Sequence, residues 1–291
     1  MKVLVTGANG QLGMHLVAEL QKKDWVNLLV AGRYDLDITD NQAVKIYFDK
    51  HSPHVVINAA AFTSVDAAEE STVQATDVNH VGAANLAEAS AKINAAIIQI
   101  STDYVFSGKS GVPYIESDLP DPVNAYGLTK LLGEKAVASI NPRHIILRTS
   151  WLFSGLGKNF YLIMSELMAK QSKISVVNDQ VGAPTYVLDL INLIVKALEK
   201  INQKKLLAWG VYHYSGYPYV SWFDFAIEIK KALFPLGAQC EIYGVSTVSY
   251  GSVAKRPYYS CLNSSKACRY FGVTPSDWMT RLNELATKVK G

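Results

Sequence analysis

The sequence predicts an α/β protein built on a doubly wound parallel sheet, with a smaller mixed α/β lobe in its second half. Short apolar runs alternate with amphipathic stretches through the first half, which is typical of strands joined by crossover helices. The runs show almost no polar alternation, which indicates parallel strands covered on both faces. A glycine-rich loop follows the first run immediately. Together these features favour a doubly wound topology.

The expected strands of the sheet are residues 2–6, 27–31, 55–58, 96–101 and 144–149, joined by helices at 10–20, 41–50, 73–93 and 126–139. After Trp151 we expect helices at 159–170, 187–200 and 221–234, strands at 174–177 and 241–245, and a tyrosine-rich turn at 212–219. We place one domain at 1–150. Residues 151–291 then form mainly the second lobe, with some segments returning to the first domain.

Composition and charge favour a small-molecule partner. The 291 residues carry 28 Lys and Arg against 25 Asp and Glu, a net charge too small to indicate nucleic acid or a membrane surface. No stretch approaches the roughly 18 apolar residues of a membrane helix, and no secretion leader precedes the glycine loop. The three cysteines suit a reducing compartment, and the histidines show no metal-ligand spacing. We therefore expect a cytoplasmic protein without a metal. A homodimer is an open alternative to a monomer.

The loop after the first strand has glycines at positions 7, 10 and 13. Glycine lets a backbone turn tightly against a pyrophosphate, and the following helix offers free N–H groups and a partial positive charge. The loop thus predicts a Rossmann-type dinucleotide site. Its candidate cofactor contacts are Gly7, Asn9, Gly10, Gln11, Leu12 and Gly13.

The position about 20 residues beyond the loop discriminates between cofactors. An acidic residue there grips the ribose 2′-hydroxyl of NAD, whereas this chain has Gly32-Arg33. A guanidinium pairs well with a 2′-phosphate, so we favour NADPH, and NADH stays open because Asp35 is close by. Asp37 and Ile38 are candidates to flank the adenine.

Tyr126 and Lys130 are spaced i and i+4 on one face of an expected helix. Positive charge beside a phenol lowers its pKa, which suits a general acid that protonates a carbonyl oxygen as hydride reaches the carbon. Thr102 lies at the end of an expected strand, at the sheet edge where ligands bind in such folds. We expect these three side chains to meet beside a nicotinamide ring.

With the glycine loop, the threonine and the Tyr–Lys pair in this order, the chain resembles the extended short-chain dehydrogenase/reductase family. Further motifs are similar to those of the dTDP-4-dehydrorhamnose reductase family and follow its order from Met1 to about Asn263. They are residues 58–66 (NAAAFTSVD), 101–106 (STDYVF), 148–151 (RTSW), 157–160 (GKNF), 178–185 (NDQVGAPT) and 256–257 (RP).

The resemblance implies NADPH-dependent reduction of C4 of dTDP-4-dehydro-β-L-rhamnose, in nucleotide-sugar biosynthesis for surface polysaccharide. It gives the catalytic places to Thr102, Tyr126 and Lys130. It puts Ala59, Ala60 and Ala61 under the cofactor and Asn79 beside the active-site backbone. The implied sugar contacts are Thr63, Val65, Tyr104 and Trp151, with Asn159, Gln180 and Thr185 in the substrate cleft. Arg256 is the candidate for the diphosphate, because a guanidinium holds phosphate oxygens in pairs.

Three alternatives stay open. Phe62 and the bulky residues after Arg256 depart from the family pattern, which leaves room for another nucleotide-linked 4-keto-6-deoxyhexose. A nucleotide-sugar dehydratase shares the Ser-Thr-Asp strand end, but it has Glu where this chain has Tyr104. A non-catalytic NADP-binding regulatory subunit, like the β subunit of methionine adenosyltransferase, shares the scaffold. The aromatic cluster at 209–225 is interpreted as packing.

Overall fold

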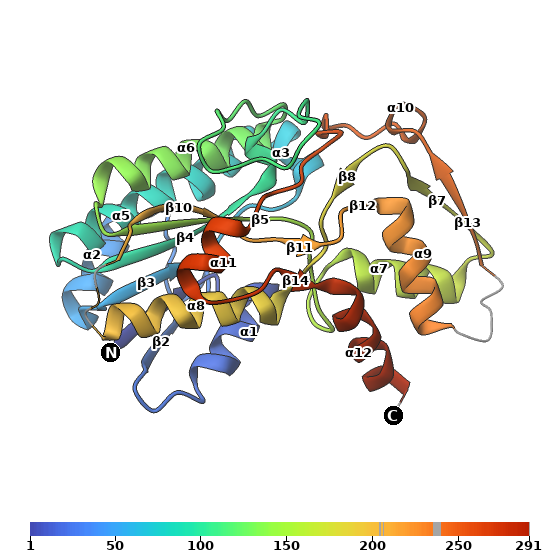
Figure 1. Ribbon diagram of the computed structural model, residues 1–291. Helices are drawn as coiled ribbons and strands as arrows, with labels where there is room; N and C mark the ends of the chain where they lie inside the picture. The colour runs from blue at the N-terminus through green and yellow to red at the C-terminus, as the bar shows by residue number, and fades with distance from the viewer. Residues whose placement is uncertain (204, 206, 235–239, 291) are drawn as a thin grey trace.

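The computed structural model describes residues 1–203, 205, 207–234 and 240–290, apart from the side chains of 288–290. A six-stranded sheet forms its centre, with the order β10-β5-β4-β3-β1-β2 and every neighbouring pair parallel. The predicted doubly wound α/β fold is confirmed (Figure 1). The strands are β1 (Lys2–Thr6), β2 (Asn27–Ala31), β3 (Val55–Asn58), β4 (Ala96–Thr102), β5 (His144–Thr149) and β10 (Gly210–His213).

Helices cover both faces of the sheet, as the apolar strands require. One face carries α1 (Gln11–Leu20), α8 (Val187–Asn202) and α11 (Ser265–Phe271), and the other carries α2 (Asn41–His51), α5 (Gly82–Lys92) and α6 (Ala125–Ile140) (Figure 1). Leu16 and Ile194 are fully buried on the first face, and Leu86 and Val137 on the second. No helix in the described part of the chain is both long and apolar enough to cross a bilayer.

The helix predicted at 73–93 is present but not uniform. It begins as α4 (Thr72–Thr76), widens into the π-helical turn η1 (Asp77–Val81) and continues as α5. A short helix that the sequence reading missed, α3 (Val65–Glu70), precedes it. A π turn points an extra residue inwards, and here the buried residue is Asn79.

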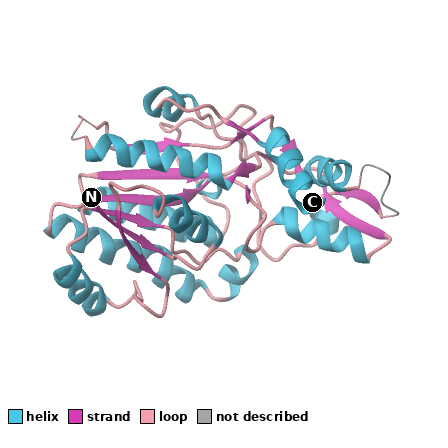
Figure 2. Cartoon of the chain, turned by 90° about the horizontal axis from the view of Figure 1, so that it is seen from below, coloured by secondary structure: helices cyan, strands magenta, loops and turns pink. Residues whose placement is uncertain are grey.

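A second lobe stands at one end of the sheet (Figure 2). Its centre is an aromatic core around Phe153, Phe225 and Trp278, all fully buried. Around this core lie α7 (Phe160–Lys170), α9 (Trp222–Leu233), α12 (Trp278–Lys290) and the parallel pair β7 (Lys173–Val177) and β13 (Glu241–Val245). The remaining elements are short: β6 (Leu152–Phe153), β8 (Val181–Gly182), β9 (Thr185–Tyr186), β11 (Gly216–Tyr217), β12 (Val220–Ser221), β14 (Ser276–Asp277), η2 (Asp103–Val105) and α10 (Thr247–Tyr250).

The prediction of a tyrosine-rich turn at 212–219 is wrong for its first two residues. Tyr212 and His213 belong to β10, which extends the sheet beside β5. Both side chains are buried, and Tyr212 packs into the core on the α8 face. Aromatic residues fit such a pleated, covered surface, so composition alone did not separate a strand from a turn here.

The carboxyl ends of β1, β3 and β4 are joined by side chains. The Thr6 hydroxyl donates to Asn58 Oδ1 at 2.7 Å, and Asn58 Nδ2 donates to Gln99 Oε1 at 2.8 Å. All three side chains are buried. This network fixes the sheet edge at the crevice between β1 and β3, where the strand order reverses and where open α/β folds bind ligands.

Candidate active site

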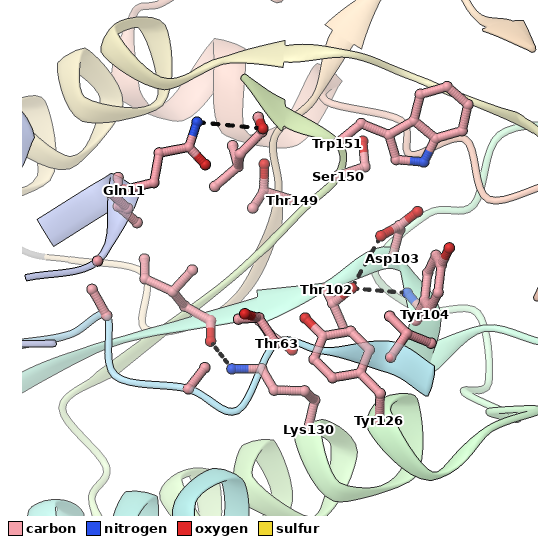
Figure 3. Close-up of a pocket in the computed structure, with 18 of the residues that line it drawn as sticks. Gln11, Thr63, Thr102, Asp103, Tyr104, Tyr126, Lys130, Thr149, Ser150 and Trp151 are labelled. Carbon is pink, nitrogen blue, oxygen red and sulfur yellow. Dashed lines mark hydrogen bonds between the residues drawn. The ribbon is translucent and has the colours of Figure 1, made fainter. Parts of the chain in front are cut away.

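A cavity of about 630 Å³ opens at this edge of the sheet, between the glycine loop and the second lobe (Figure 3). Its volume lies in the usual range for a small-molecule site. It brings together most of the residues that the sequence singled out. Those lining it are Asn9, Gly10, Gln11, Leu12, Ala59, Ala60, Ala61, Thr63, Val65, Thr102, Tyr104, Tyr126, Lys130, Trp151 and Arg256.

The glycine loop is packed so closely that side chains cannot enter it. Gly7 has φ +66°, and a Cβ there would lie 2.5 Å from the Ala60 nitrogen. A Cβ on Gly13 would lie 2.2 Å from the Gly7 oxygen. Helix α1 begins after Gly10 with no side-chain cap and no acidic residue in its first turn. Its N-terminus therefore keeps the free N–H groups and partial positive charge that suit a phosphate.

Two elements bring the three proposed catalytic side chains together. Thr102 ends β4, while Tyr126 and Lys130 lie on the first turns of α6. The Tyr126 hydroxyl lies close to the Thr102 hydroxyl. Lys130 Nζ donates to the Ile100 carbonyl at 2.7 Å. The phenol and the ammonium thus face one cavity, as the i, i+4 spacing predicts (Figure 3).

Close backbone contacts seat α6 in this position. A Cβ on Gly127 would lie 2.1 Å from the Tyr104 oxygen, and one on Gly133 would lie 2.1 Å from the Asn79 oxygen. The Asn79 amide donates to Thr129 Oγ1 at 3.1 Å and exchanges two hydrogen bonds with the Phe62 backbone. The π turn is therefore a brace between α6 and the loop after β3, and Asn79 itself does not line the cavity.

A buried ion pair lies behind Lys130. Arg148 donates to both Glu134 oxygens, with an Nη2–Oε2 distance of 2.7 Å, and each side chain is only 4% exposed. The Ser101 hydroxyl donates to Glu134 Oε1 at 2.5 Å. Burial lowers the pKa of Lys130 to about 8, and the Glu134 charge opposes that shift. Glu134 thereby favours the charged form of Lys130.

The expectation that Lys130 lowers the pKa of Tyr126 is wrong in this structure. Burial raises the pKa of Tyr126, and the nearby Thr102 hydroxyl only partly opposes this shift. The ammonium is bound to the Ile100 carbonyl rather than to the phenol. Desolvation disfavours a phenolate more than the neighbouring groups stabilise it, so Tyr126 stays protonated at neutral pH.

Asp103 is a cavity residue that the sequence analysis quoted but assigned no role. Its side chain is 2% exposed, and Oδ1 accepts from Thr102 Oγ1 at 3.0 Å. In the described residues Oδ2 has no partner at hydrogen-bond geometry, although Ser260 lies near the carboxyl group. Burial raises the pKa of Asp103 to about 7. A shifted carboxyl group beside Thr102 and Tyr126 is typical of a functional site.

Two stacked tryptophans form one wall of the cavity. Trp151 and Trp222 lie with ring centroids 3.4 Å apart and planes 9° apart. Trp151 has φ +43°, and a Cβ on Gly182 would lie 2.5 Å from its ring. The glycine therefore leaves the space that the indole occupies. The aromatic cluster at 209–225 was predicted to be packing, yet its Trp222 both packs and lines the cavity.

Arg256 is the cation of the cavity that comes from the C-terminal part of the chain. Its Nη2 donates to Asp66 Oδ2 at 2.6 Å, and its guanidinium also lies beside the Tyr104 hydroxyl. A guanidinium has five donors, so these two partners leave donors free for an anion. Arg256 is thus held in place from two sides while it faces the cavity.

Several predicted site residues do not line the cavity. Asn159 caps α7, Gln180 donates to Thr247, and Thr185 accepts from the Gly216 nitrogen. Each is buried and engaged within the second lobe or between short strands. Arg33 and Asp37 are exposed beyond the glycine loop, and Ile38 is buried against Gly82. Gly7 and Gly13 shape the loop from behind.

The cavity also contains residues to which sequence reasoning gave no role. They are Met14, Ile100, Ser101, Asp103, Thr149, Ser150, Leu152, Gly157, Lys158 and Trp222. Thr149 ends β5 as Thr102 ends β4, and Ser150 follows directly, so their position at a strand end was the available signal. Across the residues that the structure describes, no group of three or more His, Cys, Asp or Glu side chains is placed to hold a metal ion.

A doubly wound parallel sheet that presents a threonine, a tyrosine and a lysine beside a glycine loop defines an oxidoreductase of the short-chain dehydrogenase/reductase class. The family model described as RmlD substrate binding domain matches residues 1–290. The chain belongs to this family, that of the dTDP-4-dehydrorhamnose reductases.

Several relatives are similar to this chain over its full length. The dTDP-4-dehydrorhamnose reductase of Aggregatibacter actinomycetemcomitans is 40% identical, over 98% of this chain and 98% of its own. The crystal structure of a dTDP-4-dehydrorhamnose reductase from Clostridium acetobutylicum matches with a TM-score of 0.92 and 38% identity, over 100% of both chains. The structure of the dTDP-4-dehydrorhamnose reductase from Bacillus anthracis in complex with NADP matches with a TM-score of 0.91 and 36% identity, over 99% of both.

Proposed function

We propose that this protein uses NADPH to reduce the C4 ketone of dTDP-4-dehydro-β-L-rhamnose to dTDP-L-rhamnose, a precursor of surface polysaccharide. The observation that carries the proposal is the meeting of Thr102, Tyr126 and Lys130 in one cavity with the glycine loop. The names of its full-length relatives support the choice of substrate. In this account residues 1–150 hold the cofactor, and residues 151–291 mainly hold the sugar nucleotide.

The residues present fit a dinucleotide. The cradle around Gly7 and Gly13 admits no side chain, and the uncapped start of α1 suits a pyrophosphate. Asp35 accepts from the Gly32 nitrogen at 2.8 Å, which turns its carboxylate back onto the loop, while Arg33 is exposed beside it. This arrangement favours NADPH over NADH, in agreement with the NADP bound by the Bacillus anthracis relative.

When bound, NADPH supplies the hydride for the carbonyl carbon. Tyr126 supplies the proton: its high pKa keeps the phenol protonated, and the close packing of Gly127 against the Tyr104 carbonyl holds it beside Thr102. Lys130 is held by the Ile100 carbonyl and brings a positive charge to the same cavity as Tyr126. We infer that this charge, supported by Glu134, stabilises the phenolate that proton transfer leaves on Tyr126.

The remaining walls suit a deoxysugar linked to a diphosphate. The indole of Trp151 offers a flat apolar face to the sugar and its methyl group, and Thr63, Val65 and Tyr104 line the same cavity. Arg256 is the cation for the diphosphate. Burial raises the pKa of Tyr104 to about 12, so this residue is a poor base and the dehydratase alternative is disfavoured.

The test is NADPH oxidation by the purified protein with dTDP-4-dehydrorhamnose and a panel of other nucleotide-linked 4-keto sugars. Tyr126→Phe should lower turnover about 10²- to 10⁴-fold, with NADPH binding nearly unchanged, because only the proton donor is lost. Preference for another sugar would favour a sister reductase. Failure to oxidise NADPH with every sugar, together with tight binding to a partner enzyme, would favour the regulatory subunit. Location in the cytoplasm and a homodimeric state stay predictions from the sequence.

A further inference from the structure

Unpartnered polar atoms are concentrated in the active-site cavity. In the described part of the chain, four buried side-chain atoms have no hydrogen-bond partner. Three of them, Asp103 Oδ2, Thr149 Oγ1 and Trp151 Nε1, belong to residues that line this cavity. Buried polar groups in native proteins are nearly always paired, and an exception calls for a physical reason. The simplest reason here is a ligand that satisfies them.

Thr149 is the least expected of the three. It is the last residue of β5, it is 5% exposed, and it lies opposite Thr102 in the register of the two strands. Neighbouring hydroxyls already have partners: Ser150 donates to the Ala183 carbonyl at 2.8 Å, and Thr102 donates to Asp103. Thr149 therefore presents an unpaired hydroxyl at the carboxyl end of β5, beside Thr102.

We propose that the Thr149 hydroxyl hydrogen-bonds the carboxamide of the nicotinamide ring and so fixes which face of the ring meets the sugar. The inference rests on the proposed use of NADPH. A cofactor with its pyrophosphate at the glycine loop must extend from Gln11 towards Tyr126, and Thr149 lies between Gln11 and Thr102 on that path (Figure 3). A carboxamide offers both a donor and an acceptor, and a threonine hydroxyl can pair with either.

The location also separates Thr149 from the sugar contacts. Arg256 lies beside Tyr104 of η2 and is paired with Asp66 of α3, the helix that begins at Val65. Thr149 lies instead on β5, next to the strand that carries the Ile100 carbonyl bound by Lys130. It thus stands beside Thr102 on an element that carries none of these three sugar contacts.

The experiment compares binding of NADPH and of 2′-phospho-ADP-ribose, which lacks the nicotinamide, by isothermal titration calorimetry. Thr149→Val keeps the side-chain shape and removes the hydroxyl, while Thr149→Ser keeps the hydroxyl and serves as the matched control. Thr149→Val should weaken NADPH binding about 3- to 10-fold and change binding of 2′-phospho-ADP-ribose less than about 2-fold, as expected for one neutral hydrogen bond. Thr149→Ser should bind both ligands nearly as the parent protein does.

Two outcomes would overturn the proposal. Equal weakening of both ligands would mean that the hydroxyl supports the fold of the strand end. Unchanged binding of both ligands with a raised KM for the sugar would place the hydroxyl on the substrate. The proposed function fails separately, if the parent protein binds NADPH but reduces no 4-keto sugar, because the calorimetric comparison needs no turnover. If the parent protein does not bind NADPH, both proposals fall.

Discussion

Gly127→Ala offers a direct test of how α6 delivers Tyr126 to Thr102. The new Cβ would lie 2.1 Å from the Tyr104 carbonyl oxygen. The oxygen is a backbone atom and the Cβ is bonded directly to the backbone, so neither can rotate away. Since real contacts of this kind need at least 3.0 Å, the first turn of α6 must move away from η2. A displacement of about 1 Å at reacting groups costs on the order of 10²-fold in rate. We expect kcat to fall by about that factor.

The assay is steady-state NADPH oxidation, with NADPH binding and thermal melting measured on the same preparations. NADPH affinity should change less than about 3-fold, because the glycine loop belongs to a different element. Gly111→Ala is the matched control, since a Cβ there meets nothing within 4 Å, and its kcat should equal that of the parent protein. Full activity in Gly127→Ala would show that the Tyr126–Thr102 contact does not depend on this close packing, and the reasoning would be refuted.

Two further predictions concern other parts of the cavity. Because burial raises the pKa of Asp103 from 3.8 to about 7, the native state binds the extra proton, and wild-type stability should fall as pH rises through that window. Asp103→Asn cannot acquire this charge. The melting temperature of the variant minus that of wild type should therefore rise by a few degrees from the acidic to the alkaline end of the window. A difference that stays constant with pH would contradict this. Trp222→Leu removes the ring stacked on Trp151 and should raise the sugar KM about 3- to 10-fold with NADPH affinity intact, and equal loss of both affinities would argue for general unfolding instead.

The sheet could be predicted closely because its strands are continuous apolar runs bounded by turn residues. The expected limits of β1, β2, β3 and β5 agree with the structure to the residue, and β4 is one residue longer. β10 was missed, since its pairing with β5 depends on contacts far apart in the chain. The local hydrophobic pattern indicates whether the faces of a strand are covered, but it does not indicate which strand lies beside it.

The same difference between local features and contacts far apart in the chain separates the site residues that could be predicted from those that could not. Thr102, Tyr126 and Lys130 were recognisable because their spacing and strand-end position are local features. The direction of the Tyr126 pKa was not, because burial by the surrounding elements outweighs the nearby charge. Trp222 reaches the cavity only through its stacking on Trp151, a contact between distant segments. The side chains of Asn159 and Thr185 accept hydrogen bonds from backbone N–H groups within the fold.

The buried pair of Glu134 and Arg148 has an evolutionary consequence. Loss of either partner alone leaves an uncompensated charge inside the molecule, which costs about 3–5 kcal/mol and is a large share of the stability of an ordinary domain. Single substitutions at either position should therefore be selected against even when no ligand touches them. Across homologous sequences, positions 134 and 148 are expected to covary, passing together from an ionic to an apolar pair or staying as they are.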